Sequence, residues 1–313
     1  MPKKDKKIAL VLSGGGAKGA FQTGALEIFY EYGYSFDVIS GISVGALNGA
    51  MIATDQFAQL QELWQTISRS DILQHRSLAG VIQQFLLHKI GIGKPPLGLN
   101  GNAPLKRLLS NYLLGKEIKI PYHFGFVKLK TGDFVNAIIR QDDHHINEDD
   151  ILRILASSAI PVQFDPVEFY GQMLVDGGIR NITPISEVLP YNPDEIVIIP
   201  TEPIGERKDD AEVNDILQIA KRTVNIMLEE IFNEDIKRFV KVNQLVQQAE
   251  QQGVTLKKAN GLPYRYIEPC IVAPEQTLGD ALNFDEQKLS ERYEAGQDRA
   301  REVLNAPRTE MEL

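Results

Sequence analysis

Cysteine is nearly absent from the sequence, because Cys270 is the single cysteine among 313 residues. A disulfide within the chain needs two cysteines, so none can form, and a metal site built on several thiolates is excluded for the same reason. A chain without disulfides is typical of a reducing compartment, so we predict a cytoplasmic protein.

Long hydrophobic runs are also missing. A membrane-spanning helix needs about 18 consecutive apolar residues, and no stretch of the sequence reaches that length. The opening MPKKDKKIALVL has the basic flank of a signal peptide, but its apolar run ends after a few residues at Ser13 and three glycines. We therefore expect no integral membrane segment and interpret the basic start as a solvated tail that leads into a buried strand.

Positive charge is in deficit. The 33 Lys and Arg residues against 42 Asp and Glu residues give a formal net charge of -9. Nucleic acids and anionic membranes attract basic surfaces, so this balance argues against a nucleic-acid partner and against broad adhesion to lipid. Any contact with a membrane surface is therefore expected to be local, transient and peripheral.

The sequence does contain a repeated pattern of strand, glycine turn and helix. Residues 8–12 lead through three glycines into a helical pattern over 17–32, and residues 38–39 lead through GISVG into an alanine-rich helical pattern. Alternation of this kind places helices on both faces of a mostly parallel sheet. Hydrophobic residues make up 43% of the chain, enough to fill a sizeable core, and we predict an α/β fold.

Further segments complete this outline. The runs on either side of Thr131-Gly132-Asp133 predict a β-hairpin, and residues 196–199 predict another buried strand. Residues 215–252 form a long amphipathic helical pattern, which we expect to pack on its own domain rather than on lipid. YRYIEPCIVAP is expected to form one more strand, and residues 285–304 predict a helix pair broken near Gly296.

Two segments invite a functional interpretation. GIGKPPLGLNGNAP, residues 91–104, is either a mobile flap over an acyl chain or an ordinary loop. DDHHINEDD places His144 and His145 among carboxylates, but adjacent side chains point in different directions. Residues 147–150 instead make a good helix cap and acidic first turn, so we predict no metal site there.

The turn GISVG is the first candidate for catalysis. It follows a strand and precedes a helix, which is the setting in which G-x-S-x-G forms a sharp elbow that exposes the serine hydroxyl. Gly41 and Gly45 lack side chains, so neighbouring segments can approach the turn closely. Ser43 is therefore the candidate nucleophile.

A serine nucleophile needs a base, and the histidines are poorly placed to supply one. They lie in helical stretches, beside a proline turn or in the acidic segment. Asp176 ends a short apolar run and is followed by Gly177 and Gly178, so its carboxylate is expected to project from a strand end. Its reference pKa is near ~4, so burial must raise the pKa before it can serve as a base towards an alcohol.

The glycine loop after the first strand is a candidate anion site. Gly14, Gly16 and Gly19 spell G-x-G-x-x-G, which suggests a dinucleotide phosphate, with Asp37 at about the distance of a ribose ligand. Asp37 precedes its strand, however, whereas a ribose-binding acid normally ends one. The backbone N–H groups at Gly14, Gly15 and Gly16 are equally suited to an oxyanion formed during catalysis, which we prefer.

Taken together, these motifs resemble those of the patatin-like phospholipases. The resemblance rests on GGGAKG at residues 14–19, GISVG at 41–45 and DGG at 176–178, in this order. ASSAIPVQFDPV, residues 156–167, is similar to the family's alanine, serine and proline segment. The similarity covers residues 7 to about 200.

The resemblance implies a three-layer α/β/α sandwich with a mostly parallel central sheet and lipid acyl hydrolysis without metal or cofactor. It makes Ser43 the nucleophile and Asp176 the base of a dyad. It assigns the oxyanion loop to Gly14, Gly15 and Gly16, and supporting roles to Lys18, Gly19, Gly41, Gly45, Gly177 and Gly178.

One departure from the family pattern and one comparison with a related family bear on this assignment. Lys18 stands where the family more usually has arginine, and lysine cannot make the planar forked contact. It either holds the loop or a substrate phosphate, or is solvated. The related malonyl transacylases are expected to have a histidine beside the serine. This chain has Val44 there, which argues against that family.

We therefore predict a catalytic domain over residues 7–204 and a C-terminal extension of helices and a strand over 205–313, packed on the core. The predicted activity is cleavage of fatty acyl esters of phospholipids, lysophospholipids or glycerides through an acyl-enzyme. The alternative is a catalytically weak lipid-binding or scaffold protein on the same fold, with the long helix as its contact surface.

Overall fold

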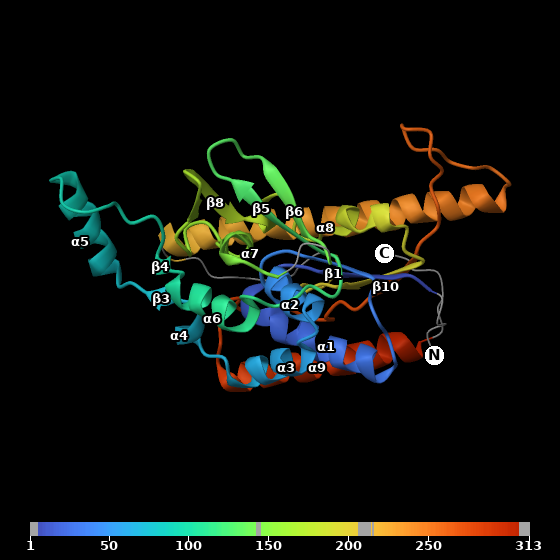
Figure 1. Cartoon of the computed structure of the whole chain (residues 1–313), viewed down its shortest axis with the longest axis horizontal. Helices are drawn as coiled ribbons and strands as arrows, with labels where there is room; N and C mark the ends of the chain where they lie inside the picture. Colours follow the sequence, from blue (N-terminus) through green and yellow to red (C-terminus); the bar gives the residue numbers. More distant parts are fainter. Residues whose placement is uncertain (1–5, 142–144, 206–213, 215, 307–313) are drawn as a thin grey trace.

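The computed structural model of the protein describes residues 6–141, 145–205, 214 and 216–306. Within these residues a central sheet of eight strands has the order β10-β9-β1-β2-β5-β8-β7, with β6 paired to β5 (Figure 1). Neighbours from β10 to β5 pair in parallel, and β6, β7 and β8 pair antiparallel. The strands are β1 (Ile8–Leu12), β2 (Val38–Gly41), β5 (Tyr122–Lys128), β6 (Phe134–Ile139), β7 (Val167–Phe169), β8 (Gln172–Asp176), β9 (Glu195–Ile199) and β10 (Glu268–Ile271).

Helices cover both faces of this sheet, which confirms the predicted α/β architecture (Figure 1). Alternate residues of β1 face opposite cores: Leu10 and Leu12 lie in one, and Ala9 and Val11 lie in the other with Phe232 of α8. The second face is covered by α8 (Ile216–Gln251). The first face is covered by α1 (Gly19–Glu31), α2 (Val44–Ala53), α3 (Phe57–Thr66) and α9 (Glu286–Asn305).

The other helices and a second, smaller sheet come between α3 and β7 along the chain. They are α4 (Arg69–Ile72), α5 (Leu78–Lys89), α6 (Ala103–Leu113), α7 (Glu148–Ser157) and a separate antiparallel pair of β3 (Gln74–His75) and β4 (Asn100–Gly101). In the part of the chain that the structure describes, no helix is both long and apolar enough to cross a bilayer.

The strand β5 determines where two distant parts of the chain meet. Residues 122–124 of β5 pair with β2, residues 126–128 pair with β8, and β6 pairs along nearly the whole strand. A strand has two edges, so β6 occupies one and β2 and β8 share the other. Because β2 and β8 run towards each other, Gly41 and Asp176 end opposite Phe124 and Phe126 of β5. Residues far apart in sequence therefore meet above one short stretch of β5.

Several local predictions are confirmed. The hairpin around Thr131-Gly132-Asp133 joins β5 to β6. Asn147 caps α7: its side chain accepts a hydrogen bond from the Asp150 N–H, and the Asp150 carboxylate accepts one from the Asn147 N–H. The long amphipathic pattern is α8, which buries Ile236 and Val240 of its middle turns against the sheet.

The expected break near Gly296 is wrong, because α9 is continuous from Glu286 to Asn305. Gly296 marks a close helix crossing instead: a Cβ there would lie 2.1 Å from the Phe21 carbonyl oxygen of α1. Gly24 of α1 makes the reciprocal close contact, since a Cβ there would lie 2.0 Å from the Tyr293 carbonyl oxygen of α9. The C-terminal segment also supplies β10 at one edge of the central sheet.

Candidate active site

Ser43 occupies a strained turn between β2 and α2. Its backbone has φ 56° and ψ -124°, a region that residues other than glycine rarely adopt. The flanking glycines are required by packing: a Cβ on Gly41 would lie 2.2 Å from the Gly45 carbonyl oxygen, and one on Gly45 2.3 Å from the Leu12 carbonyl oxygen. The Ser43 N–H donates to the Ser157 Oγ of α7 at 3.2 Å. The predicted serine elbow is therefore present as a backbone conformation.

Asp176 lies at the end of β8, where the chain turns into a short 3-10 helix over Gly177–Ile179. Its backbone N–H donates to the Ala159 carbonyl at 3.0 Å, and its Oδ1 accepts from the Gly178 N–H at 2.7 Å. Gly177 is packed against β5, since a Cβ there would lie 2.4 Å from the Gly125 carbonyl oxygen. These contacts hold the carboxylate in one orientation.

Burial gives Asp176 an unusual proton affinity. The residue is 4% exposed, and desolvation raises the pKa of Asp176 to about 7, although the Gly178 N–H and the Ser43 side chain stabilise its ionised form. Its second oxygen, Oδ2, is buried and accepts no hydrogen bond of normal geometry from the described residues. Ser43 and Asp176 line the same cavity, together with Gly14, Gly15 and Gly16.

The glycine loop turns sharply into α1. Gly15 and Gly16 have φ of 153° and 58°, and a Cβ on either would overlap a neighbour: Thr201 Oγ1 at 2.1 Å for Gly15 and the Ala281 carbonyl oxygen at 2.2 Å for Gly16. The Gly14 N–H donates to the Ile182 carbonyl at 3.3 Å. No described residue accepts a hydrogen bond from the N–H of Gly15 or Gly16. Within the described part of the chain, two of the three predicted donors therefore have no acceptor, and the third already donates to a backbone carbonyl.

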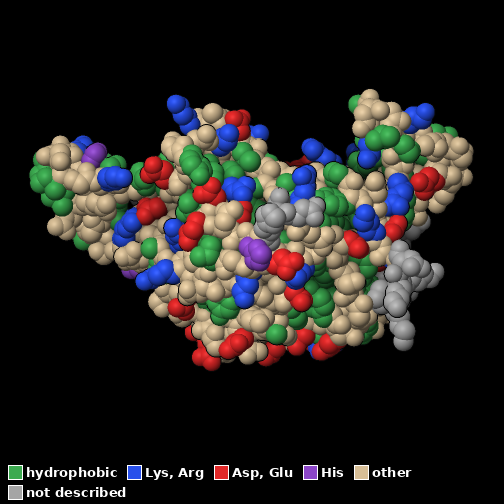
Figure 2. All heavy atoms as spheres, in the orientation of Figure 1, with side chains coloured by type: hydrophobic (Ala, Val, Ile, Leu, Met, Phe, Trp, Pro, Cys, Tyr) green, Lys and Arg blue, Asp and Glu red, His purple; other side chains and the backbone are tan. Residues whose placement is uncertain are grey.

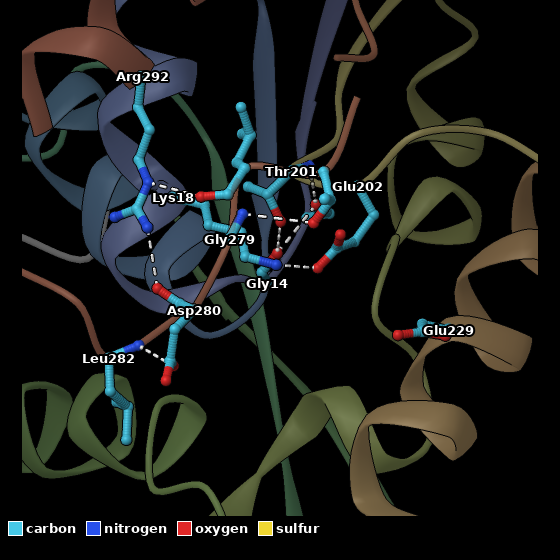
Figure 3. Close-up of polar contacts among 12 residues, drawn as sticks. Gly14, Lys18, Thr201, Glu202, Glu229, Gly279, Asp280, Leu282 and Arg292 are labelled. Carbon is cyan, nitrogen blue, oxygen red and sulfur yellow. Dashed lines mark hydrogen bonds and ion pairs between the residues drawn. The ribbon is translucent and has the colours of Figure 1, made fainter. Parts of the chain in front are cut away.

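Residues that the sequence did not single out hold this loop in place (Figure 3). The Thr201 hydroxyl donates to the Gly14 carbonyl, and the Ala17 N–H donates to the Ala281 carbonyl at 2.7 Å. Arg292 of α9 is 4% exposed. Its guanidinium donates to the carbonyls of Leu278, Asp280 and Asn283 at 2.9, 2.9 and 2.8 Å. Arg292 thereby holds in place the loop over residues 278–283, whose Ala281 contacts the glycine loop.

Lys18 is not solvated, so that alternative is wrong. The side chain is 4% exposed and forms an ion pair with Glu202, and both residues line the cavity that contains Ser43 (Figure 3). Gly19 begins α1 where a Cβ would lie 2.4 Å from Val44 Cγ2. This close contact seats α1 against the first turn of α2.

Ser43 lies where two cavities meet. The first is narrow and apolar, has a volume of about 60 Å³ and is enclosed by side chains of α2, α3, α4 and α6. Leu47, Leu60, Trp64 and Leu109 are among its lining residues. The second has a volume of about 530 Å³ and is lined by the glycine loop, Asp176, residues 277–282 and one side of α8. The site therefore offers a narrow apolar slot and a wider space lined by both charged and apolar side chains.

The remaining candidates have structural roles or lie outside the described part. Asp37, weighed as a ribose ligand, accepts a hydrogen bond from the Ile8 N–H at 2.7 Å. His144 lies outside the described residues, and among those described no cluster of three or more His, Cys, Asp or Glu side chains could hold a metal ion. Leu99 of the predicted flap lines the larger cavity.

These features define an α/β protein with a strained serine turn between strand and helix. Residues 10–189 match the family model Patatin, described as patatin-like phospholipase. Since this match spans more than half of the chain, the protein belongs to the patatin-like phospholipase family.

Curated relatives share parts of the chain. Lysophospholipase nte1 of Aspergillus terreus is 46% identical over 50 residues, which are 16% of this chain and 3% of that protein. The uncharacterized protein YqhO of Bacillus subtilis is 27% identical over 190 residues, 56% of this chain and 64% of that protein. This chain thus spans less than two thirds of either relative. The structure of VipD from Legionella pneumophila aligns with a TM-score of 0.48 and 14% identity, covering 96% of this chain and 67% of that one.

Proposed function

We propose that the protein is a lipid acyl hydrolase that uses Ser43 as nucleophile and Asp176 as base. The observation that carries the proposal is the shared cavity of a strained serine, a buried carboxylate and two backbone N–H groups that have no acceptor among the described residues. Membership of the patatin-like phospholipase family supports the reaction class. The substrates proposed are acyl esters of phospholipids, lysophospholipids or glycerides.

The proposed reaction has two halves. In the first, Ser43 Oγ attacks the ester carbonyl while its proton passes to the ionised Asp176, and the resulting oxyanion is stabilised by the N–H groups of Gly15 and Gly16. The intermediate collapses to an acyl-enzyme as Asp176 returns the proton to the leaving alcohol. In the second half Asp176 takes a proton from water as the water oxygen attacks the acyl carbonyl. The bond to Ser43 Oγ then breaks, Asp176 returns the proton to that oxygen, and the fatty acid is released.

The two cavities support a division of the substrate between them. The apolar cavity beside Ser43 has room for part of an acyl chain, whose burial is favourable in proportion to its apolar area. The larger cavity is lined by Lys18 and several carboxylates and also by apolar side chains such as Ile182 and Phe232, so it suits the glycerol and head group of a lipid together with a further apolar part. Ser43 would then face the ester bond that joins the two parts.

The proposal is tested with the purified protein and its Ser43→Ala variant. A fluorophosphonate probe should label the wild-type protein at Ser43, and fatty acid should be released from a panel of phospholipids, lysophospholipids and glycerides. Both signals should disappear in Ser43→Ala, because the attacking oxygen is gone. Ester hydrolysis retained by the folded variant would refute the assignment. A protein that holds lipid stoichiometrically but releases no acid over hours would instead be a lipid-binding protein.

The rate of hydrolysis should depend on pH through Asp176. The base acts as the ionised carboxylate, so kcat/KM should be level above pH ~8 and fall about tenfold per pH unit once the pH is below the pKa of Asp176, about 7. The measurement is fatty acid release from a monomeric ester between pH 5 and 9, with circular dichroism to verify folding at each pH. A rate that stays level from pH 5 to 8 would contradict the role of Asp176.

A further inference from the structure

The helix α5 projects from one end of the molecule and leaves apolar side chains exposed (Figure 1). Ile82, Phe85, Leu86 and Ile90 are 58%, 47%, 57% and 71% exposed. Their spacing of three, four and eight residues from Ile82 places them on one face of the helix. None of the described helices or strands packs extensively against α5. Exposed apolar side chains that cluster in this way mark a surface that contacts something else.

The exposed apolar face continues into the loop after the helix. Ile92 and Leu97 are 56% and 49% exposed. We call the set Ile82, Phe85, Leu86, Ile90, Ile92 and Leu97 the projecting surface. Figure 2 shows hydrophobic side chains gathered at this end of the molecule, with basic and histidine side chains beside them.

The charge of this region differs in sign from that of the chain. Residues 72–116 contain six Lys or Arg residues and no Asp or Glu, although the whole chain has a net charge of -9. Two of the six, Lys89 and Lys94, lie on or beside the projecting surface and are exposed. Neither forms an ion pair with a described residue, and the Lys89 ammonium lies 5.1 Å from the centre of the Phe85 ring. The acidic groups of a partner can therefore approach the ammonium groups of both Lys89 and Lys94.

The projecting surface is also connected along the chain to the candidate active site. Leu99, two residues after Leu97, lines the cavity that contains Ser43 and Asp176. Beyond it, Leu105 and Leu109 of α6 line the apolar cavity on the other side of Ser43. A partner that contacts the projecting surface would thus contact a segment that leads within a few residues to the lining of both cavities.

We propose that the projecting surface docks on the anionic surface of a lipid bilayer. Apolar residues with flanking lysines are the combination that binds such a surface, since the apolar side chains enter the head-group region and the ammonium groups contact acidic lipids. The binding event requires no catalysis. Its purpose, the delivery of substrate lipid to Ser43, rests on the proposed function.

The test measures binding in the Ser43→Ala background, so that no lipid is consumed. Cosedimentation is measured with vesicles of phosphatidylcholine alone and of phosphatidylcholine with about one third phosphatidylglycerol. Binding is expected on the anionic vesicles. It should fall at least about tenfold in Phe85→Ser/Leu86→Ser/Ile90→Ser, because three apolar side chains no longer enter the lipid. It should also fall, and lose most of its salt dependence, in Lys89→Gln/Lys94→Gln.

The matched control is Val254→Ser/Leu262→Ser, which removes apolar side chains that are 50% and 59% exposed away from the projecting surface. This variant should bind anionic vesicles as tightly as the parent. Absence of vesicle binding by the parent, or equal loss in the control, would overturn the proposal. A dimer in lipid-free solution that the triple substitution dissociates would also overturn it, by assigning the surface to a second copy of the chain.

A separate measurement keeps this proposal distinct from the catalytic one. With Ser43 present, the triple variant should hydrolyse a monomeric short-chain ester at the wild-type rate and vesicle lipid more slowly. Equal rates on vesicle lipid would overturn the docking proposal. If the wild-type protein hydrolysed neither substrate, the proposed function would fail, while the binding result would still decide the docking surface.

Discussion

Asp176→Asn is expected to lower kcat/KM for ester hydrolysis by about 10²- to 10⁴-fold, the usual contribution of a positioned general base. An amide of nearly the same shape keeps an oxygen for the Gly178 N–H, which the carboxylate now accepts at 2.7 Å. It cannot take the proton from Ser43. The loss should therefore appear in the chemical step while the fold is retained.

The same variant should be more stable than the wild-type protein at alkaline pH. Because burial raises the folded-state pKa of Asp176 to about 7, the folded protein disfavours the ionised carboxylate. The neutral carboxyl favours folding fully below the unfolded pKa, near ~4, and this advantage is lost as the pH rises through about 7. Asparagine stays neutral at every pH. The melting temperature of Asp176→Asn should thus exceed that of the wild-type protein at pH 8 and approach it at pH 4.

Asp235→Asn is the matched control. Burial also raises the pKa of Asp235, to about 6, but this residue of α8 is not among those that line the cavity with Ser43. Its substitution should leave ester hydrolysis near the wild-type rate. If Asp176→Asn kept more than a tenth of wild-type activity, or if Asp235→Asn lost as much, the assignment of Asp176 as the base would be wrong.

The parts of the site predicted from sequence are those encoded in short segments. A serine between two glycines after a strand has few other structural explanations, and the Cβ overlaps at Gly41 and Gly45 show why both glycines are needed. Asp176 could be proposed because a strand end followed by two glycines exposes a carboxylate. The shared edge of β5 that brings Asp176 to the serine turn depends on strand register, which no single segment encodes.

The supports of the glycine loop could not be predicted, for a related reason. Arg292 lies in a helix rich in charged residues, where an arginine normally faces solvent, and its burial depends on three carbonyls of the loop that precedes this helix. Gly296 was interpreted as a helix break because glycine is a poor helix former. In the structure it is a point of close approach between α9 and α1, so packing against another helix outweighs local propensity.

Gly16→Ala is the second substitution from which we expect a large effect. At φ 58° an alanine is strained, and its Cβ would lie 2.2 Å from the Ala281 carbonyl oxygen, so the loop or its neighbour must move. The Ala281 carbonyl also accepts the Ala17 N–H at 2.7 Å, and Arg292 holds the surrounding segment, which limits how far that neighbour can shift. The Gly16 N–H should therefore leave its position. Loss of one oxyanion donor typically lowers the rate by about 10²- to 10³-fold.

Gly33→Ala separates this effect from backbone strain. Gly33 has φ 77°, and a Cβ there would meet nothing within 4 Å, so its substitution introduces the conformational strain without the overlap. Both variants should melt at a lower temperature than the wild-type protein, but only Gly16→Ala should lose ester hydrolysis and react slowly with the fluorophosphonate probe. Near-normal labelling of Gly16→Ala would show that the anion is held elsewhere. The donors would then have to be sought away from the glycine loop, even with Ser43 and Asp176 unchanged in their roles.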